Sequence, residues 1–128
     1  RITESTRMVL DYLKGNARVE RLLFPLDVDF PQYELAKKQM KNACGLMSFY
    51  VKAGSRGQIV KCCESLKHIM MAVSWGGHES LILPRCASLE DHQFDPGNPD
   101  HRMLRLYVGL ENPDYLIRDL DQAFRSSF

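Results

Sequence analysis

Two short segments carry polar residues that packing alone does not require. The first, Ser74–Gly77, is a Ser-Trp-Gly-Gly turn, whose glycines expose backbone N–H groups and admit a ligand closely because they have no Cβ. The second, Leu104–Leu106, places Arg105 between two leucines. The planar fork of an arginine suits a carboxylate or a phosphate. Together the two segments predict one anion-binding site.

The alternation of Met103–Val108 is typical of a strand, in which successive side chains point to opposite faces. One face would receive the apolar residues Leu104, Leu106 and Val108. The other would carry Arg105 and Tyr107, so the guanidinium leaves the sheet opposite its main apolar face. The Ser-Trp-Gly-Gly turn would follow a strand over His68–Val73, which delivers the chain to Ser74.

Hydrophobic periodicity and capping residues predict the remaining elements. They are a helix from Ile2 to Gly15, a strand Val19–Phe24, a helix Pro31–Met40, a strand Leu46–Val51, a helix from Ser55 through Leu66, and a helix that starts at Asn112-Pro113 and runs through Phe124. Glu79–Leu83 reads as short and extended, and Cys86–His101 as an irregular loop. The expected fold is a single α+β domain over residues 1–128, a two-layer sandwich whose small, mostly antiparallel four-stranded sheet is covered by helices.

Composition excludes several classes of function. Seventeen Lys and Arg against sixteen Asp and Glu leave a net charge of +1, without a basic stripe, so neither nucleic acid nor a membrane surface is expected as a partner. No apolar run approaches the ~20 residues that span a bilayer, and the first residues lack the apolar core of a secretory signal. A cytosolic protein is expected.

The cysteines and histidines do not predict a metal site. Cys62 and Cys63 are adjacent, which is poor geometry for a disulfide framework and for a zinc clamp. All four cysteines are therefore expected to be ordinary buried thiols. The four histidines show no ligand spacing, and His78 and His101 are interpreted as surface residues.

Several motifs, in order along nearly the whole chain, resemble one family. They are Ala17–Glu20 leading into Phe24-Pro25, then Pro31–Met40, Cys44–Phe49, Ser65–Lys67, Val73–Ser80, Leu104–Glu111 and Asp119–Phe124. This pattern resembles the C-terminal domain of the Cys/Met-metabolism (trans-sulfuration) enzymes, which use pyridoxal phosphate (PLP). The resemblance implies the C-terminal domain of the aspartate-aminotransferase-like PLP fold and a sulfur amino-acid substrate. The Ser-Trp-Gly-Gly motif is most similar to that of cystathionine β-lyases, although His78 stands where tyrosine is expected.

The resemblance also implies roles for particular residues. An arginine at the position of Arg105 holds the substrate α-carboxylate in that family, and Ser74 with the Trp75 amide would line the same site. Gly76 and Tyr107 are further candidates for the pocket wall. Their residue types also allow structural roles: a turn hydroxyl for Ser74, a packing anchor for Trp75 and sheet packing for Tyr107.

Arg105 likewise has a structural alternative. It could extend into solvent, or it could pair with Glu79 or Glu111, as an arginine on a surface strand commonly does. A carboxylate clamp and a surface ion pair are thus the two interpretations that the pattern leaves open for this side chain.

Family precedent places the cofactor lysine, the acid at the pyridine nitrogen and the phosphate cup in a preceding large domain. None of the seven lysines here lies in the cofactor motif, so no catalytic residue is expected in this chain: Lys14, Lys37, Lys38, Lys41, Lys52, Lys61 and Lys67. A chain that begins inside a helix suggests a segment of a longer protein. The whole enzyme would be a homotetramer, and this part alone a monomer or weak oligomer. The rival hypothesis is a stand-alone, non-catalytic α+β module that binds a ligand or a partner.

Overall fold

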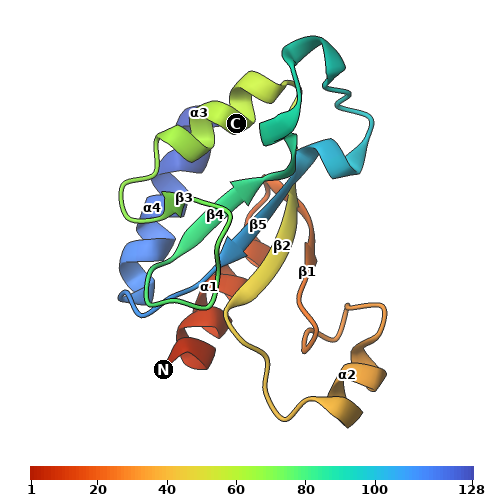
Figure 1. Ribbon diagram of the computed structural model, residues 1–128, viewed down its shortest axis with the longest axis vertical. Coiled ribbons are helices and arrows are strands. Elements are labelled where there is room, and N and C mark those ends of the chain that lie inside the picture. Colours follow the sequence, from red (N-terminus) through yellow and green to blue (C-terminus); the bar gives the residue numbers. More distant parts are fainter.

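The computed structural model describes residues 1–128, and its centre is a five-stranded sheet in the order β1-β2-β5-β4-β3 (Figure 1). The strands are β1 (Val19–Leu23), β2 (Leu46–Val51), β3 (Met70–Met71), β4 (Leu81–Pro84) and β5 (Met103–Tyr107). The helices are α1 (Ile2–Gly15), α2 (Tyr33–Gln39), α3 (Arg56–Glu64) and α4 (Pro113–Ser127). Only the β3–β4 pair is parallel, so the sheet is mixed and mostly antiparallel.

Two helices begin where their capping residues predict. The Ser55 hydroxyl accepts a hydrogen bond from the Gln58 amide at 3.3 Å, and the Asn112 side chain accepts one from the Asp114 amide at 2.9 Å. Each bond satisfies one of the amide donors that a helix N-terminus leaves free. Pro113 adds a fixed φ at the first position of α4, where no amide donor is needed.

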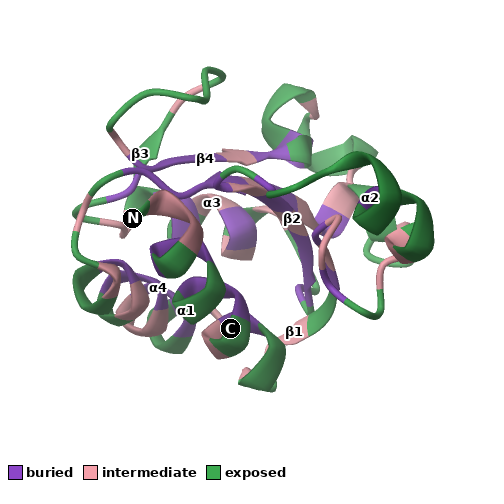
Figure 2. Ribbon diagram, turned by 90° about the horizontal axis from the view of Figure 1, so that it is seen from below, coloured by how far each residue is buried: buried purple, intermediate pink, exposed green.

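Helices α1, α3 and α4 cover one face of the sheet and enclose the core (Figure 2). The alternation predicted for β5 is confirmed, because Leu104, Leu106 and Val108 are buried on this face. Phe49 of β2 meets Phe124 of α4 edge to face, with ring centroids 6.1 Å apart. The opposite face has no helix layer over it, and the loop after β3 rises on that side (Figure 2).

The predicted α+β sandwich is confirmed, with one strand more than expected. The segment read only as extended, Glu79–Leu83, contains β4, which pairs with β5 on one side and β3 on the other. The strand predicted over His68–Val73 shortens to Met70–Met71. Its first amides bond instead to a carboxylate of α4, that of Asp119, which takes them out of the ladder.

The segment predicted to be an irregular loop, Cys86–His101, is a series of short turns. Three 3-10 helices follow one another, at Arg85–Ser88, Asp91–Gln93 and Pro99–Arg102. Polar side chains cap two of these helices through local hydrogen bonds: Glu90 and Gln93 form a reciprocal capping box, and Asn98 caps the last helix. Hydrophobic periodicity cannot reveal such turns, because each is too short to complete a helical repeat.

The prediction that all cysteines are buried is wrong for Cys44, which is exposed, and correct for Cys62, Cys63 and Cys86. Burial raises the pKa of the Cys62 thiol to about 12, and it also raises the pKa values of Cys63 and Cys86. A high pKa suppresses the reactive thiolate, so these three thiols should be slow nucleophiles.

The folded chain should therefore consume one equivalent of an aromatic disulfide reagent quickly at neutral pH, and four equivalents after unfolding in guanidinium. The measurement is the absorbance of the released thiolate against time. Cys44→Ser should abolish the fast phase and leave three thiols in the unfolded chain. Two or more fast thiols in the folded protein would contradict the burial of Cys62, Cys63 and Cys86.

Candidate functional site

Arg105 and Tyr107 lie side by side on the face of β5 that points away from the helices. In the strand register Arg105 stands between Ser48 of β2 and Leu83 of β4. Tyr107 stands one row along and is only 3% exposed, whereas Arg105 is half-buried. The sequence-based assignment of both side chains to this face is correct. It places a cation on an otherwise largely apolar sheet surface.

Both side chains hold the loop that joins β3 to β4. The Arg105 guanidinium donates a hydrogen bond to the Val73 carbonyl, and the Tyr107 hydroxyl donates one to the Gly77 carbonyl at 3.0 Å. These bonds hold the Ser-Trp-Gly-Gly turn against the end of the sheet face that has no helix layer over it, which is called the open face from here on. Gly76 has a φ of 87°, in the left-handed region that favours glycine. The turn therefore depends on glycine at that position.

The predicted site residues are thus brought together, but they are differently exposed. Ser74 follows directly after the carbonyl that Arg105 holds, and Trp75 extends into solvent with 57% of its surface exposed. A packing role for Trp75 inside this chain does not fit that exposure. The surface pairing considered for Arg105 is not seen, because Glu79 pairs with His78 and Glu111 bonds to Ser80.

The root of the loop, meaning Ser80 where the chain enters β4, is held by Glu111. Sequence reasoning considered Glu111 only as a partner for Arg105. One Glu111 carboxylate oxygen accepts the Ser80 amide and the other accepts the Ser80 hydroxyl, both at 2.7 Å. The same hydroxyl accepts the Gly109 amide at 2.9 Å. The sequence carries a signal for this contact: an acid comes directly after the Gly109-Leu110 pair that follows β5, and a serine comes directly before β4.

Gly109 is required by the close approach of two backbones. A Cβ on Gly109 would lie 2.3 Å from the His78 carbonyl oxygen and 2.7 Å from the Glu79 carbonyl carbon. At the same place the Leu110 amide donates to the His78 carbonyl at 2.7 Å. The loop root and the end of β5 are therefore in direct backbone contact, which only glycine permits.

Tyr107 is protonated in this environment at neutral pH. Burial raises the pKa of its hydroxyl above the usual value of 10.0, and the nearby Cys44, Glu79 and Glu111 raise it further. A protonated tyrosine donates its hydrogen bond, which is the role it has toward the Gly77 carbonyl. Its hydrogen bond to the Gly77 carbonyl makes it a support for the loop.

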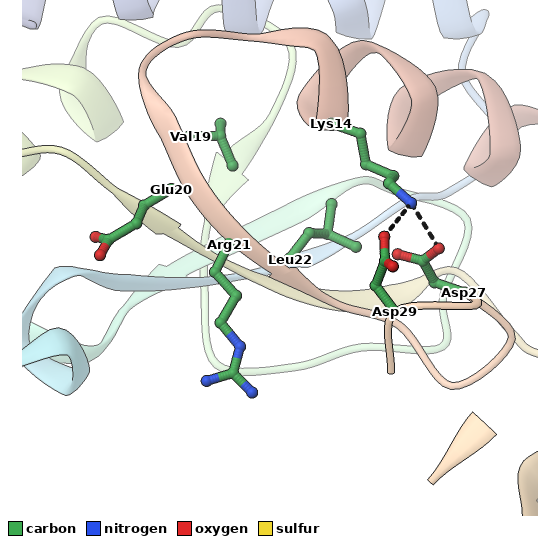
Figure 3. Close-up of a pocket in the computed structure, with 7 residues that line it drawn as sticks. All are labelled: Lys14, Val19, Glu20, Arg21, Leu22, Asp27 and Asp29. Atoms are coloured by element: carbon green, nitrogen blue, oxygen red, sulfur yellow. Dashed lines mark hydrogen bonds and ion pairs between the residues drawn. The ribbon is translucent and has the colours of Figure 1, made fainter. Parts of the chain in front are cut away.

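A polar cavity of about 230 Å³ lies elsewhere, between the end of α1, strand β1 and the turn that follows it (Figure 3). Figure 3 shows Lys14 reaching from α1 to Asp27 and Asp29, at 2.7 and 2.9 Å. The hydrogen bonds to these two carboxylates raise the pKa of Lys14 above 10.5. None of the predicted site residues lines this cavity, and the ion pairs fasten α1 to the turn after β1.

The guanidinium of Arg105 is a group on the open face that could pair with a carboxylate. None of the strand residues flanking Arg105 is a lysine, and both Lys14 and Lys37 are engaged in ion pairs on other elements. No group of three or more His, Cys, Asp or Glu side chains could hold a metal ion. None of the helices has the combination of length and apolar composition that a membrane span requires.

The chain is similar to known proteins along nearly its whole length. A family model described as Cys/Met metabolism PLP-dependent enzyme matches residues 1–125. Cystathionine gamma-lyase of Bos taurus is 35% identical over 128 residues, which cover 97% of this chain and 31% of that protein. L-methionine gamma-lyase of Treponema denticola is 38% identical over 128 residues, covering 93% of this chain and 30% of the relative.

Solved structures show the same similarity. The cystathionine gamma synthase of Xanthomonas oryzae pv. oryzae, solved with aminoacrylate and cysteine, superposes with a TM-score of 0.83 at 27% identity, over 98% of this chain and 33% of that one. The cystathionine gamma-lyase of Lactobacillus plantarum, complexed with L-serine, gives a TM-score of 0.81 at 29% identity, over the same shares of the two chains. The chain therefore spans only a minor part of the length of its relatives.

Proposed function

The chain belongs to the Cys/Met-metabolism family of PLP-dependent enzymes, and from this premise we propose that the whole protein is a carbon–sulfur lyase or a related trans-sulfuration enzyme. Residues 1–128 form its C-terminal domain, which clamps the carboxylate of a sulfur amino acid. One observation carries the proposal: Arg105 stands on the open face of β5 with its guanidinium against the loop of the Ser-Trp-Gly-Gly turn.

The chemistry of the clamp follows from the guanidinium. In its present position Arg105 donates to a neutral backbone carbonyl, that of Val73. A substrate carboxylate is a stronger acceptor, because a charge-assisted bidentate pair provides two parallel bonds. Ser74 and the Trp75 amide lie next to that carbonyl in the chain and would contact the same carboxylate. Tyr107 holds the turn in place through Gly77.

Direction matters as much as affinity. When bound, PLP supplies an electron sink for the carbanion that forms at Cα. The residues that hold PLP would come from outside this chain. Arg105 contributes orientation, since two bonds to a planar carboxylate fix which bond at Cα lies in the reactive direction. The apolar surface around it, including Leu83 and Met103, would exclude water from the bound amino acid.

The finer assignments belong to the same proposal. The substrate is a sulfur amino acid such as cystathionine, and a β-lyase reaction would release a thiol, pyruvate and ammonia. The Ser-Trp-Gly-Gly turn favours the β-lyase, while the relatives named above are γ-lyases and a γ-synthase. We further propose a cytosolic homotetramer, without nucleic-acid or membrane partners. The rival, a stand-alone binding module, would use the same clamp without catalysis.

The test compares the protein translated from the complete reading frame with the 128-residue chain alone. The complete protein should carry PLP and release a thiol from cystathionine or methionine. The chain alone should show neither the cofactor absorbance nor turnover, because none of its lysines lies in the cofactor motif. The readouts are the visible absorbance spectrum and a thiol assay. A complete protein that lacks PLP, or that cleaves no sulfur amino acid, would favour the binding module.

A further inference from the structure

The loop of residues 72–80 is fastened to the sheet at two places. Its outer part is held by Arg105 and Tyr107, through the Val73 and Gly77 carbonyls. Its root is held at Ser80, where the chain enters β4. Between these points Ser74, like the rest of the turn, is exposed to solvent. The position of the turn relative to Arg105 therefore depends on how firmly the root is held.

Every hydrogen-bonding group at the root is committed. The Ser80 hydroxyl accepts the Gly109 amide, so its own proton goes to Glu111. The Ser80 amide donates to the other Glu111 oxygen. Ser80 is fully buried, so water cannot replace a missing acceptor there. Ser80 thus presents two donors to a single side chain, and a carboxylate can meet each of them with its own oxygen.

From this arrangement we propose that Glu111 is a positioning residue, which holds Ser80 through both carboxylate oxygens and thereby sets where Ser74–Gly77 lies relative to Arg105. This inference rests on the proposed function, since it concerns the geometry of the carboxylate clamp. Arg105 lies within β5 and Glu111 lies in the segment that follows β5, so neighbouring parts of the chain carry the clamp and the anchor of the loop that completes it.

Glu111→Gln tests the proposal with little change in volume. A glutamine has one acceptor oxygen and one donor nitrogen in place of two oxygens, so the amide and the hydroxyl proton of Ser80 no longer each face an oxygen of their own. Glu79→Gln is the matched control, because Glu79 lies in the same loop but pairs only with the exposed His78. Glu111→Asp keeps both acceptor oxygens, so its Trp75 signals and kinetics should lie between those of Glu111→Gln and those of the wild type.

The first readout is the fluorescence of Trp75, the only tryptophan in the chain, which lies in the turn itself. In the 128-residue chain Glu111→Gln should increase acrylamide quenching and lower the anisotropy of Trp75, at a temperature where circular dichroism shows the fold intact. Glu79→Gln should leave both unchanged. Identical Trp75 signals in wild type and Glu111→Gln would overturn the proposal.

The second readout is the kinetics of the complete protein. Glu111→Gln should raise KM more than it lowers kcat, and it should reduce kcat/KM by about ten- to a hundredfold, since a displacement of the order of 1 Å in a positioning group has effects of that size. PLP content should stay normal. Loss of kcat/KM only in proportion to lost PLP would make Glu111 structural. A wild-type protein without activity would reject the proposed function, while the Trp75 measurement would still decide the role of Glu111.

Discussion

In the complete protein, Arg105→Lys should lower kcat/KM for a sulfur amino acid by roughly ten- to a hundredfold, or more, with normal PLP content. Lysine keeps the positive charge but has no planar fork, so one of the two carboxylate bonds is lost. Charge-assisted bonds of this kind contribute about 1.5 to 3 kcal/mol. The orientation of the substrate also suffers, so Arg105→Ala should cost more than Arg105→Lys. Steady-state kinetics of the purified variants provide the measurement.

The hydrogen bond that Arg105 makes within this chain determines which control variants are needed. Arg105 also fastens the loop at Val73, so part of any loss could come from a displaced turn. Tyr107→Phe separates the two effects, because it removes the bond to Gly77 and leaves the guanidinium intact. Arg21→Lys is the control for charge and size, since Arg21 lies on the edge strand β1, two strands from Arg105, over the Tyr50 ring of β2. Near wild-type kinetics for Arg105→Lys would contradict the carboxylate clamp and indicate that Arg105 is only a surface residue.

Asp119→Ala should destabilise the folded chain by about 3 kcal/mol or more, the largest expected effect on stability outside the apolar core. The Asp119 carboxylate is 3% exposed and accepts the amides of Lys67, His68 and Ile69 at 2.7 to 3.1 Å. Alanine would remove the acceptor from all three amides; the Ile69 bond is buried and the other two are partly buried, and an unpaired buried donor costs about 1 to 3 kcal/mol. Denaturation by urea, followed by circular dichroism, measures the change.

Asp121→Asn is the matched control on the same helix. Asp121 is partly exposed and pairs with Arg125 at 2.9 Å, one turn along the helix, a type of pair that contributes about 0.5 kcal/mol or less. It also accepts a hydrogen bond from the Tyr12 hydroxyl at 3.3 Å, which the asparagine side-chain oxygen can still accept. The variant should therefore unfold close to wild type. If Asp119→Ala were as mild as Asp121→Asn, the loop between α3 and β3 would be held by its own backbone rather than by α4.

Features encoded within a few neighbouring residues were predictable from the sequence. The alternation along Met103–Val108 assigned Arg105 to the face away from the helices, because side-chain direction in a strand has a period of two. Ser55 and Asn112 predicted the starts of α3 and α4, because a capping side chain accepts a hydrogen bond from an amide two or three residues ahead. The family motifs identified the chain because they recur in order along almost its whole length.

Contacts between distant segments were decided only by the tertiary structure. The bonds from Glu111 to Ser80 and from Asp119 to the amides of residues 67–69 join positions 31 and 50 to 52 residues apart. Strand β4 was underestimated for the same reason: four residues carry little periodicity, and their place inside the sheet depends on the pairing of β4 with β5. Local pattern reports which way a side chain points. Which carboxylate meets which buried amide depends on how the layers pack, since that packing decides which donors lose contact with water and must find a partner within the fold.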